Sequence, residues 1–476
     1  MELTTPIAQK RKREKIKEGL SQKERFRCEY LLPHKNGRQC NMTRKASERF
    51  CAQHLSASEY NESGEHQKVE DVKERVKCPL DRTHSVWLQD ISRHLKRCRA
   101  AKQTPTEIWF DKDCNLLRPE PTEYVPVSEQ GITFEEYHKW IAFVEKFYTT
   151  TIAGTKFENL PLKKLQHDGV TRRLNELSNK KHAIQQGSLL AILDDTELLA
   201  TENHYIEFGA GRGELSRYLH QALLHNRSLP KYNPTFLLID RTGTRMKLDG
   251  KIIKDWEDRE PPKFDKPPVV KRFKTDIKDL NFIKDSNHIL KRREDGSGRV
   301  VAISKHLCGA ATDLTLKCLD NYIRALDSTH PKSSMPLGGI MIALCCRHRC
   351  TYSTYPLQYL DPHANEIDPR GFEILSKMTS WAICGRRPNK LKNTDDLAPN
   401  SSDDEHHDKL VTGENESMHV SKLSISYREE IGHKVRAMID YGRVRQLEHN
   451  GVKVELIRYV DKSVSSENVC LLATLD

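Results

Sequence analysis

The stretch HYIEFGAGRGELSRYL, residues 204–219, constrains the fold of this chain more than any other part of the sequence. An apolar run is followed by three closely spaced glycines and then by an amphipathic helical pattern. That order predicts a strand, a tight turn and a helix, because glycine permits the backbone angles that such a turn requires. A turn of this kind lets a ligand approach the backbone at the end of a strand, so the stretch predicts a site for a nucleotide-like ligand.

Short apolar runs continue to alternate with helical patterns after this stretch. TFLLID, VVAISK and GGIMIALCC predict buried strands, and two further strands are expected near the C-terminus, in KVELIRYV and NVCLLATL. Runs of this kind, separated by helices, favour a mostly parallel sheet covered on both faces. We therefore expect residues 131–476 to form one α/β domain with a seven-stranded sheet. Residues 386–420 have almost no apolar content and predict a disordered insertion within it.

The charge of the chain points to a polyanionic partner. The formal net charge is +11, and residues 1–27 carry nine Lys or Arg against four Asp or Glu. This N-terminal segment fits either a solvated helix or a basic arm that touches phosphates. No apolar run is long enough to cross a membrane, and no apolar segment follows the basic run as in a secretory signal. We expect an intracellular protein of the nucleus, the cytoplasm or both, with no obligate protein partner.

The thirteen cysteines, spaced among histidines, predict metal sites and buried thiols instead of a disulfide framework. The segment CPLDRTHSVWLQDISRHLKRC, residues 78–98, has the spacing C-x5-H-x9-H-x3-C. Zinc prefers four soft or borderline ligands in a tetrahedron, so this spacing predicts a zinc finger over residues 75–102. Its pattern is similar to the CHHC finger of a minor-spliceosome protein family and of certain RNA methyltransferases. The predicted ligands are Cys78, His84, His94 and Cys98.

A second cluster of possible zinc ligands lies upstream, and its longer gaps make the pattern less specific. A CCCH-type module is expected over residues 28–56, with His34 as a competing ligand and partly buried thiols as the alternative. Four protein ligands leave no open position on the ion, so both sites are expected to staple small modules and not to catalyse. Residues 103–130 contain four prolines and are expected to form a linker. The predicted ligands of the upstream module are Cys28, Cys40, Cys51 and His54.

The order E-x-G-x-G-x-G around the glycine turn resembles the first motif of class I S-adenosylmethionine-dependent methyltransferases, which have a Rossmann-like fold. A dinucleotide-binding fold would instead show G-x-G-x-x-G. The resemblance implies that the backbone approaches S-adenosylmethionine and that an acid meets its ammonium group. A second acid would accept hydrogen bonds from the ribose hydroxyls, and a third would contact the adenine edge. The predicted cofactor-binding residues are Glu207, Gly209, Gly211, Gly213, Asp240 and Asp276.

The fourth predicted strand leads into SKHLCGAATDL, where a methyl acceptor should meet the donor. The sequence has no Asn/Asp-Pro-Pro-Tyr run at this point, and no proline precedes Cys308, which disfavours a thiolate nucleophile. A ribose hydroxyl must be oriented or deprotonated as the methyl group arrives, and a desolvated lysine or a neutral histidine can do this. Lys305 and His306 are the candidates, and Asp313 is expected to hold one of them in place. Cys308 and Cys318 are expected to be core thiols.

The segment LCCRHRC follows the fifth predicted strand and offers Cys345, Cys346, His348 and Cys350. A third metal site is conceivable here. Adjacent cysteines on a strand point to opposite faces, however, and this disfavours a shared ion. The preferred interpretation is a loop facing the substrate, with Arg347 and Arg349 available to phosphates.

Together, these motifs resemble the eukaryotic tRNA ribose 2'-O-methyltransferase family that modifies nucleotide 4 of the acceptor stem. The resemblance rests on the two finger patterns, YIEFGAGRGELS, SKHLCGAATDLTLKCL, ALCCRHRC and YREEIGHKVRAMIDYGR. It implies methylation of the 2'-oxygen of cytidine or adenosine at position 4, in tRNAs such as those for proline, glycine and histidine. Family members more often have two histidines where this chain has Arg347 and His348, and this difference bears on substrate preference.

Two other functions remain open at this point. The chain could methylate a different target, such as an RNA base, or it could be a non-catalytic zinc-finger RNA-binding protein with a degenerate methyltransferase domain. The intact Glu207, the three glycines and Asp240 disfavour the second alternative. We expect the basic arm and the two zinc modules to hold the tRNA acceptor stem, since duplex RNA is recognised through its shape, phosphates and 2'-hydroxyls.

Overall fold

The computed structural model consists of two compact units, Met1–Pro105 and Thr106–Asp476. The residues that the structure describes are 26–32, 38–40, 42–51, 75–80, 85–95, 98, 108–177, 180–225, 232–243, 246–258, 267–284, 290, 293, 295–328, 335–383 and 419–475. The predicted basic arm, except for its last two residues, and residues 386–418 of the predicted insertion lie outside them. Within the described residues, every helix is too short or too polar to span a bilayer.

A seven-stranded sheet forms the centre of the second unit, which confirms the predicted mostly parallel sheet. Its spatial order is β12-β13-β11-β10-β7-β8-β9. β13 runs antiparallel to both of its neighbours, whereas the five strands from β11 to β9 are parallel. The strands are β7 (His204–Phe208), β8 (Thr235–Asp240), β9 (Val269–Lys274), β10 (Val300–Leu307), β11 (Leu337–Leu344), β12 (Lys453–Arg458) and β13 (Val469–Thr474).

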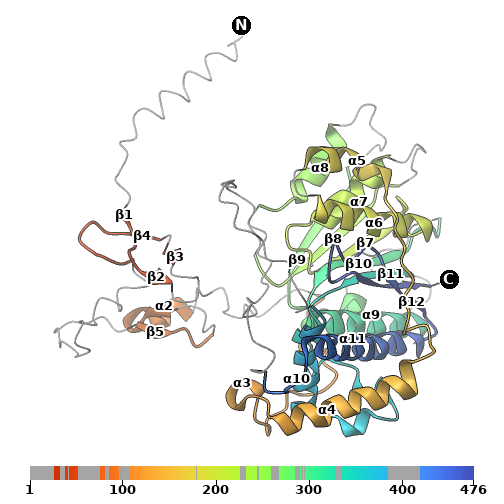
Figure 1. The fold of residues 1–476 in the computed structure, drawn as a ribbon. Helices are drawn as coiled ribbons and strands as arrows, with labels where there is room; N and C mark the ends of the chain where they lie inside the picture. Colours follow the sequence, from red (N-terminus) through yellow and green to blue (C-terminus); the bar gives the residue numbers. More distant parts are fainter. Residues whose placement is uncertain are drawn as a thin grey trace. The chain divides into compact units, whose positions relative to one another are not determined.

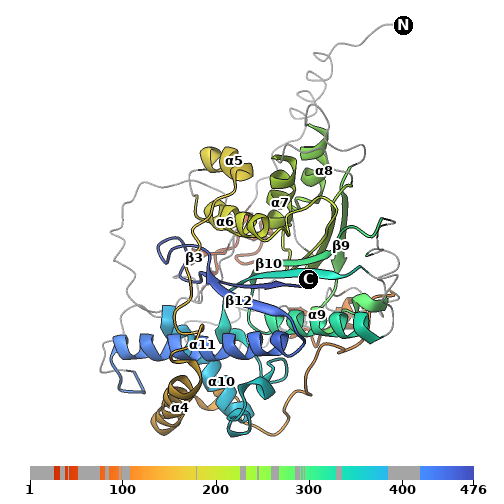
Figure 2. The same cartoon turned by 90° about the vertical axis from the view of Figure 1, so that its right-hand side faces the viewer.

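Helices cover both faces of this sheet (Figures 1 and 2). One face carries α6 (Lys181–Asp195), α7 (Glu214–His225) and α8 (Asp249–Glu257). The other carries α9 (Ala310–Ser328) and α11 (Ile425–Glu448), with α4 (Phe134–Phe147) and α10 (Pro369–Met378) packed on α11. Successive strand residues point to opposite faces. Tyr205 and Ile206 accordingly belong to two different apolar clusters, which explains why both sides of the sheet are buried.

The helix α4 begins with a capping box. Thr133 accepts a hydrogen bond from the Glu136 amide, and the Glu136 carboxylate accepts one from the Thr133 amide. A π-helical turn, Tyr148–Ile152, follows the helix directly. The other α-helices among the described residues of this unit are α3 (Val127–Gln130) and α5 (Thr171–Glu176).

The segment predicted as a linker, 103–130, packs against the sheet domain over its described part. Trp109 is buried and stacks on Phe273 of β9, with ring centroids 5.2 Å apart. The buried Asn115 side chain donates hydrogen bonds to the carbonyl oxygens of Ile277 and Leu280. The prolines indicated an irregular segment, from which we predicted a linker. One buried aromatic ring and one hydrogen-bonded buried amide are nevertheless enough to anchor an irregular segment to the domain.

The described residues of the first unit form short paired strands, a 3-10 turn at Leu88–Asp90 and a short α-helix. β1 (Phe26–Arg27) pairs with β4 (Thr43–Arg44), and β2 (Leu31–Leu32) pairs with β3 (Arg38–Gln39). β5 (Arg75–Lys77) pairs with β6 (Ser85–Trp87), and α2 (Ile91–Leu95) follows. Its largest buried side chains among the described residues are the cysteines, so metal binding must replace the missing apolar core.

Candidate active site

The order in which the chain adds its parallel strands reverses between β7 and β10. Counted along the chain, the strands of the parallel part lie in the order 3-2-1-4-5, and the reversal falls between the first and the fourth. Ligands of doubly wound sheets bind at the carboxyl ends of the strands beside such a reversal. The predicted glycine turn follows β7, and the predicted catalytic segment ends β10, so the fold brings both to this place.

The glycine turn connects β7 directly to α7. Gly209 and Gly211 have φ values of +63° and +48°, which side-chain-bearing residues rarely adopt. A Cβ at Gly211 would have no atom within 4 Å, so the turn leaves free space beside its backbone. Arg272 of β9, which sequence reasoning missed, supports the turn by donating a hydrogen bond to the Gly211 carbonyl oxygen over 2.8 Å. The turn therefore has the open backbone that a cofactor requires.

Asp240 lies at the end of β8 and closes the turn from the side. Its Oδ2 accepts a hydrogen bond from the Gly211 amide over 2.8 Å, and its Oδ1 accepts from the amide and hydroxyl of Thr242. A carboxylate accepts about four hydrogen bonds, so this half-buried acid retains capacity for a ligand hydroxyl. Asp276 lies at the end of β9, caps a 3-10 turn through the Lys278 amide and is 3.8 Å from Arg241.

Glu207 is buried on β7, and its described contacts are with α7. Its Oε2 accepts hydrogen bonds from the amide and the hydroxyl of Ser216, over 3.1 and 2.5 Å. Burial raises the pKa of this carboxyl to about 7, and the Ser216 hydrogen bonds oppose the shift. The acid thus ties the strand to the helix, a contact that the sequence motif did not reveal.

The shifted pKa of Glu207 predicts a pH-dependent stability. A carboxyl whose folded-state pKa is raised loses stability as the pH rises from its unfolded value, near 4.5, to about 7. We expect Glu207→Gln to stabilise the ligand-free fold by roughly 2 kcal/mol more at pH 8 than at pH 5. Urea unfolding of both proteins at the two pH values measures this. Glu257→Gln, at an exposed position of α8, is the control and should give the same small change at both.

Lys305 is buried near the end of β10, with its Nζ 3.2 Å from Nδ1 of His182 on α6. His182 is a residue that sequence reasoning missed, because nothing in the local pattern KKHAIQQGS relates it to the fourth strand. His306 lies within β10, and its side chain is outside the part that the structure describes. The fold therefore places a buried amine beside the glycine turn, with an imidazole next to it.

The predicted role of Asp313 does not match its contacts. Its two carboxylate oxygens accept from Nε and Nη2 of Arg443 on α11, over 2.7 and 3.2 Å, and both residues are buried. These bonds orient the carboxylate toward α11, so Asp313 serves an ion pair with Arg443 instead of the role that was predicted for it. No local sequence pattern could indicate this contact, because Arg443 lies 130 positions away from Asp313 in the sequence.

Arg347 was expected to contact phosphates, and the structure corrects this too. It is buried and donates to Asp440 over 2.6 Å and to Glu467 over 2.7 Å. Of the two arginines, only Arg349 is exposed and remains available to phosphates as predicted. Three arginines and three acids alternate here, so the buried charges balance. This buried ion network consists of Asp313, Arg347, Arg436, Asp440, Arg443 and Glu467.

Three thiols meet where the loops after β10 and β11 begin. The sulfur atoms of Cys308, Cys345 and Cys346 lie within 4.8 Å of one another. The argument from strand alternation was wrong here, because β11 ends at Leu344 and the backbone at Cys346 has left strand geometry, with φ −45° and ψ 79°. Cys318, by contrast, is a core thiol as predicted.

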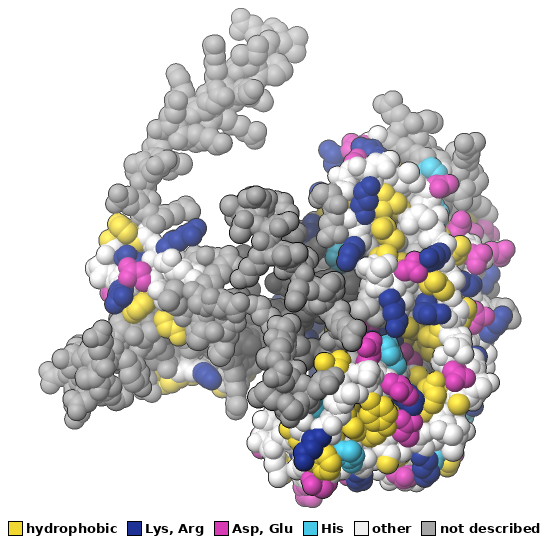
Figure 3. All heavy atoms as spheres, in the orientation of Figure 1, with side chains coloured by type: hydrophobic (Ala, Val, Ile, Leu, Met, Phe, Trp, Pro, Cys, Tyr) yellow, Lys and Arg dark blue, Asp and Glu magenta, His cyan; other side chains and the backbone are white. Residues whose placement is uncertain are grey.

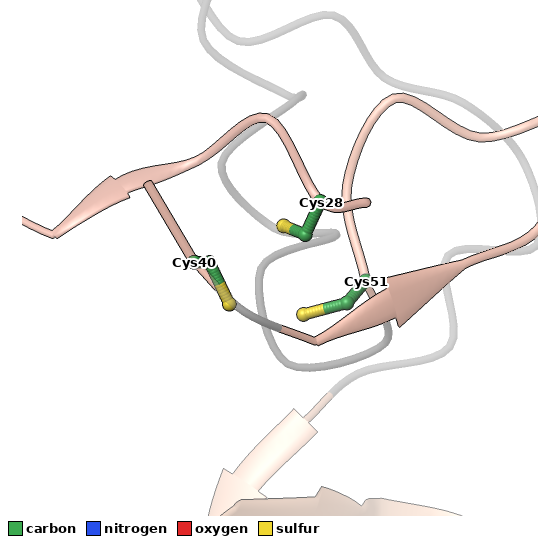
Figure 4. A group of neighbouring side chains, drawn as sticks. All are labelled: Cys28, Cys40 and Cys51. Atoms are coloured by element: carbon green, nitrogen blue, oxygen red, sulfur yellow. The ribbon is translucent and has the colours of Figure 1, made fainter. Parts of the chain in front are cut away.

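Each finger pattern brings its described ligands together. Cys28, Cys40 and Cys51 are buried, and their thiols point toward one another within 4.8 Å (Figure 4). Cys78, His94 and Cys98 form a second group, with His94 Nε2 3.2 Å from the Cys78 sulfur. The fourth predicted ligands, His54 and His84, lie outside the described residues. Clustered soft donors without an apolar core fit structural zinc.

A protein-family model described as "Methyltransferase TRM13" matches residues 184–474. The chain belongs to the TRM13 methyltransferase family. Two further models match the first unit: a "CCCH zinc finger in TRM13 protein" at residues 27–55 and a "U11-48K-like CHHC zinc finger" at residues 75–99. A TRM13 methyltransferase takes its methyl group from S-adenosylmethionine, and its two fingers bind zinc, so both predicted cofactors agree with the family and with the residues present.

Relatives from fungi and humans match almost the whole chain. A protein of Yarrowia lipolytica is 38% identical over 94% of this chain and 89% of its own length. One of Saccharomyces cerevisiae is 33% identical, over 94% and 96% of the two chains. Both are named "tRNA:m(4)X modification enzyme TRM13". The human protein, named as a homolog of that enzyme, is 31% identical over 94% of each chain. The similarity thus includes the fingers as well as the TRM13 methyltransferase domain.

Proposed function

We propose that this TRM13 family member methylates the ribose 2'-oxygen of nucleotide 4, a cytidine or adenosine, in the acceptor stem of tRNAs such as those for proline, glycine and histidine. The observation that carries the proposal is the meeting of the open glycine turn and the buried Lys305 on adjacent strands at the reversal of the sheet. The relatives are named tRNA:m(4)X modification enzymes, and this name supports tRNA as the substrate class and nucleotide 4 as the modified position.

We further propose that the sheet domain is a class I, Rossmann-like methyltransferase fold. The order 3-2-1-4-5 of the parallel strands is that of a doubly wound dinucleotide fold. The difference is the last strand, β13, which inserts antiparallel between β11 and β12. This order supports the assignment independently of the glycine motif, because it depends on the pairing of strands and not on local sequence.

The residues that we assign to the cofactor surround the glycine turn. When bound there, S-adenosylmethionine supplies an electrophilic methyl group on its sulfonium. Asp240 would accept a hydrogen bond from a ribose hydroxyl with the lone pair that Gly211 and Thr242 leave free. Asp276 would face the adenine edge, and Glu207 would place negative charge near the ammonium group while it holds Ser216.

This assignment predicts the effect of removing the carboxylate at 240. Asp240→Ala should weaken S-adenosylmethionine binding at least tenfold, since hydrogen bonds to a charged group contribute about 1.5–3 kcal/mol. Isothermal titration calorimetry measures the dissociation constant. Asp258→Ala, which removes an exposed acid at the end of α8, should leave it unchanged. Equal affinity of Asp240→Ala and the unaltered protein would remove Asp240 from the cofactor site.

We assign the acceptor chemistry to Lys305. Its amine, if neutral, can take the proton of a 2'-hydroxyl as the oxygen forms its bond to carbon. His182, 3.2 Å away, can then accept the proton from Nζ and pass it toward solvent. His306, on the same strand, is the alternative for the first of these steps. Alignment of the hydroxyl by the same amine would contribute even where proton transfer comes late.

We infer that the two zinc modules and the basic arm hold the acceptor stem. Figure 3 shows basic and acidic side chains interspersed over the visible face of the second unit, which is not the continuous positive surface that phosphates favour. Nine of the 78 Lys and Arg residues lie in residues 1–27. Deletion of residues 1–105 should therefore weaken tRNA binding at least tenfold and reduce its salt dependence. Filter binding at several salt concentrations measures both, and unchanged values would contradict this role.

The experiment that tests the proposed function is mass spectrometry of tRNA fragments after incubation with the full chain and methyl-labelled cofactor. We expect one labelled methyl group at nucleotide 4. The bond on its 3' side should resist alkali, because the blocked 2'-oxygen can no longer attack the phosphate. A labelled but alkali-sensitive nucleotide would indicate base methylation. Absence of label on any tRNA would favour a non-catalytic RNA-binding protein.

A further inference from the structure

The loops after β10 and β11 lie against each other at the carboxyl edge of the sheet. Gly309, in the first loop, has φ +53°, and a Cβ there would be 2.3 Å from the backbone carbon of Arg349 in the second. The buried Arg443 reaches both loops, with Nη2 3.5 Å from the Gly309 carbonyl oxygen and 3.2 Å from the Cys350 sulfur. The two loops thus form one packed layer, only a few residues beyond Lys305.

Three thiols face one another within this layer. The Cys308 and Cys345 sulfurs are 2.9 Å apart, well beyond the roughly 2.05 Å of a disulfide bond, and Cys346 completes the group within 4.8 Å. Sulfur atoms bound to one tetrahedral zinc lie about 3.8 Å apart, from a Zn–S length of about 2.3 Å. The group is the same kind of cluster as the three cysteines of the first finger, where zinc belongs to the family.

A nitrogen donor lies two residues along the chain from Cys346, outside the 4.8 Å group that the three sulfur atoms form. Nδ1 of His348 is buried and has no hydrogen-bond partner among the described residues. A buried imidazole nitrogen without a partner is costly, whereas imidazole nitrogen is a common zinc ligand. The other nearby thiol is occupied differently, since the Cys350 sulfur faces Arg443 in the buried ion network. The available donors are therefore three gathered thiols and one imidazole, which has to turn toward the sulfur atoms to complete a tetrahedral set.

We propose that Cys308, Cys345, Cys346 and His348 bind a third zinc ion. Four protein ligands leave no open position, so this ion is structural and does not activate the substrate. It fastens the loop that follows Lys305 to the loop that follows β11, and it thereby fixes the end of β10 beside the glycine turn. The site lies in the methyltransferase unit and is separate from both fingers, and the proposal does not depend on the methyl acceptor.

The test is the zinc content of the full chain, purified under reducing conditions without chelator and measured by plasma mass spectrometry. We expect three zinc ions per chain, and two in Cys345→Ser. Cys114→Ser is the matched control: it changes a half-buried thiol that contacts backbone carbonyls of Lys278 and Leu280, and it should keep three ions. Combining Cys345→Ser with the finger variant Cys78→Ser should leave one.

Two zinc ions in both the unaltered protein and Cys345→Ser would overturn the proposal. So would a peptide pair joined by a Cys308–Cys345 disulfide in the protein isolated without reductant. If Cys345→Ser does not fold, the less buried Cys346→Ser takes its place. Cobalt substitution of the unaltered chain gives a further measurement, because the thiolate-to-cobalt absorption should correspond to three sites and drop by about one third in Cys346→Ser.

Discussion

Lys305→Ala is expected to reduce methyl transfer to tRNA by about a hundredfold or more and to leave S-adenosylmethionine binding within about twofold. A positioned acid or base contributes roughly 10²–10⁴ to a rate, and alanine removes both the proton acceptor and the group that aligns the hydroxyl. The cofactor residues lie on β7 and β8 and in the segments that follow β7 and β9, so they do not depend on this amine. Single-turnover transfer of labelled methyl and calorimetric cofactor binding measure the two effects.

The control for this variant is Lys377→Ala, which removes a half-exposed amine on α10 that lies 3.7 Å from Glu373. It should change neither measurement. His182→Ala separates the two roles proposed for the Lys305 amine. If His182 relays the proton, its loss should slow single-turnover methyl transfer, while pure alignment by Lys305 predicts a nearly unchanged rate. Turnover of Lys305→Ala at more than a third of the normal rate would move the acceptor role to His306.

Arg443→Met is expected to destabilise the methyltransferase unit by about 3–5 kcal/mol. The substitution leaves the fully buried Asp313 without its bidentate partner, and removing one member of a buried pair has an effect of this size. Burial already raises the pKa of the Asp313 carboxyl, and the Arg443 guanidinium is what opposes that shift. Urea unfolding followed by circular dichroism gives the free-energy change.

Arg445→Met is the matched control, two positions along the same helix. Arg445 is exposed and pairs with Glu448 on the same face of α11, so its loss should change stability by no more than about 0.5 kcal/mol. The double variant Arg443→Met/Asp313→Leu should recover part of the stability, because it removes both charges together. Equal effects of Arg443→Met and Arg445→Met would show that the buried ion network does not stabilise the fold.

Several features could be predicted from sequence because their signals are local. The glycine spacing, the apolar runs and the C-x5-H-x9-H-x3-C pattern each lie within a few tens of residues, and each reflects one element or one ion. The strand–turn–helix at 204–219 and the clustering of the described zinc ligands followed from them. The linker prediction did not foresee the packing of its described part, since Trp109 and Asn115 contact residues more than 150 positions away in the sequence.

What the sequence alone determined was the class of fold, the family and the identity of most candidate ligands, because residue type and short-range spacing carry that information. Only the tertiary structure decided which side chains from distant parts of the sequence contact one another. It places Lys305 next to His182 and brings the thiols of Cys308, Cys345 and Cys346 together. It also places Asp313 and Arg347 in the buried ion network. These contacts join separate elements, and their energies depend on burial and charge balance that appear only once the sheet and its helices are assembled.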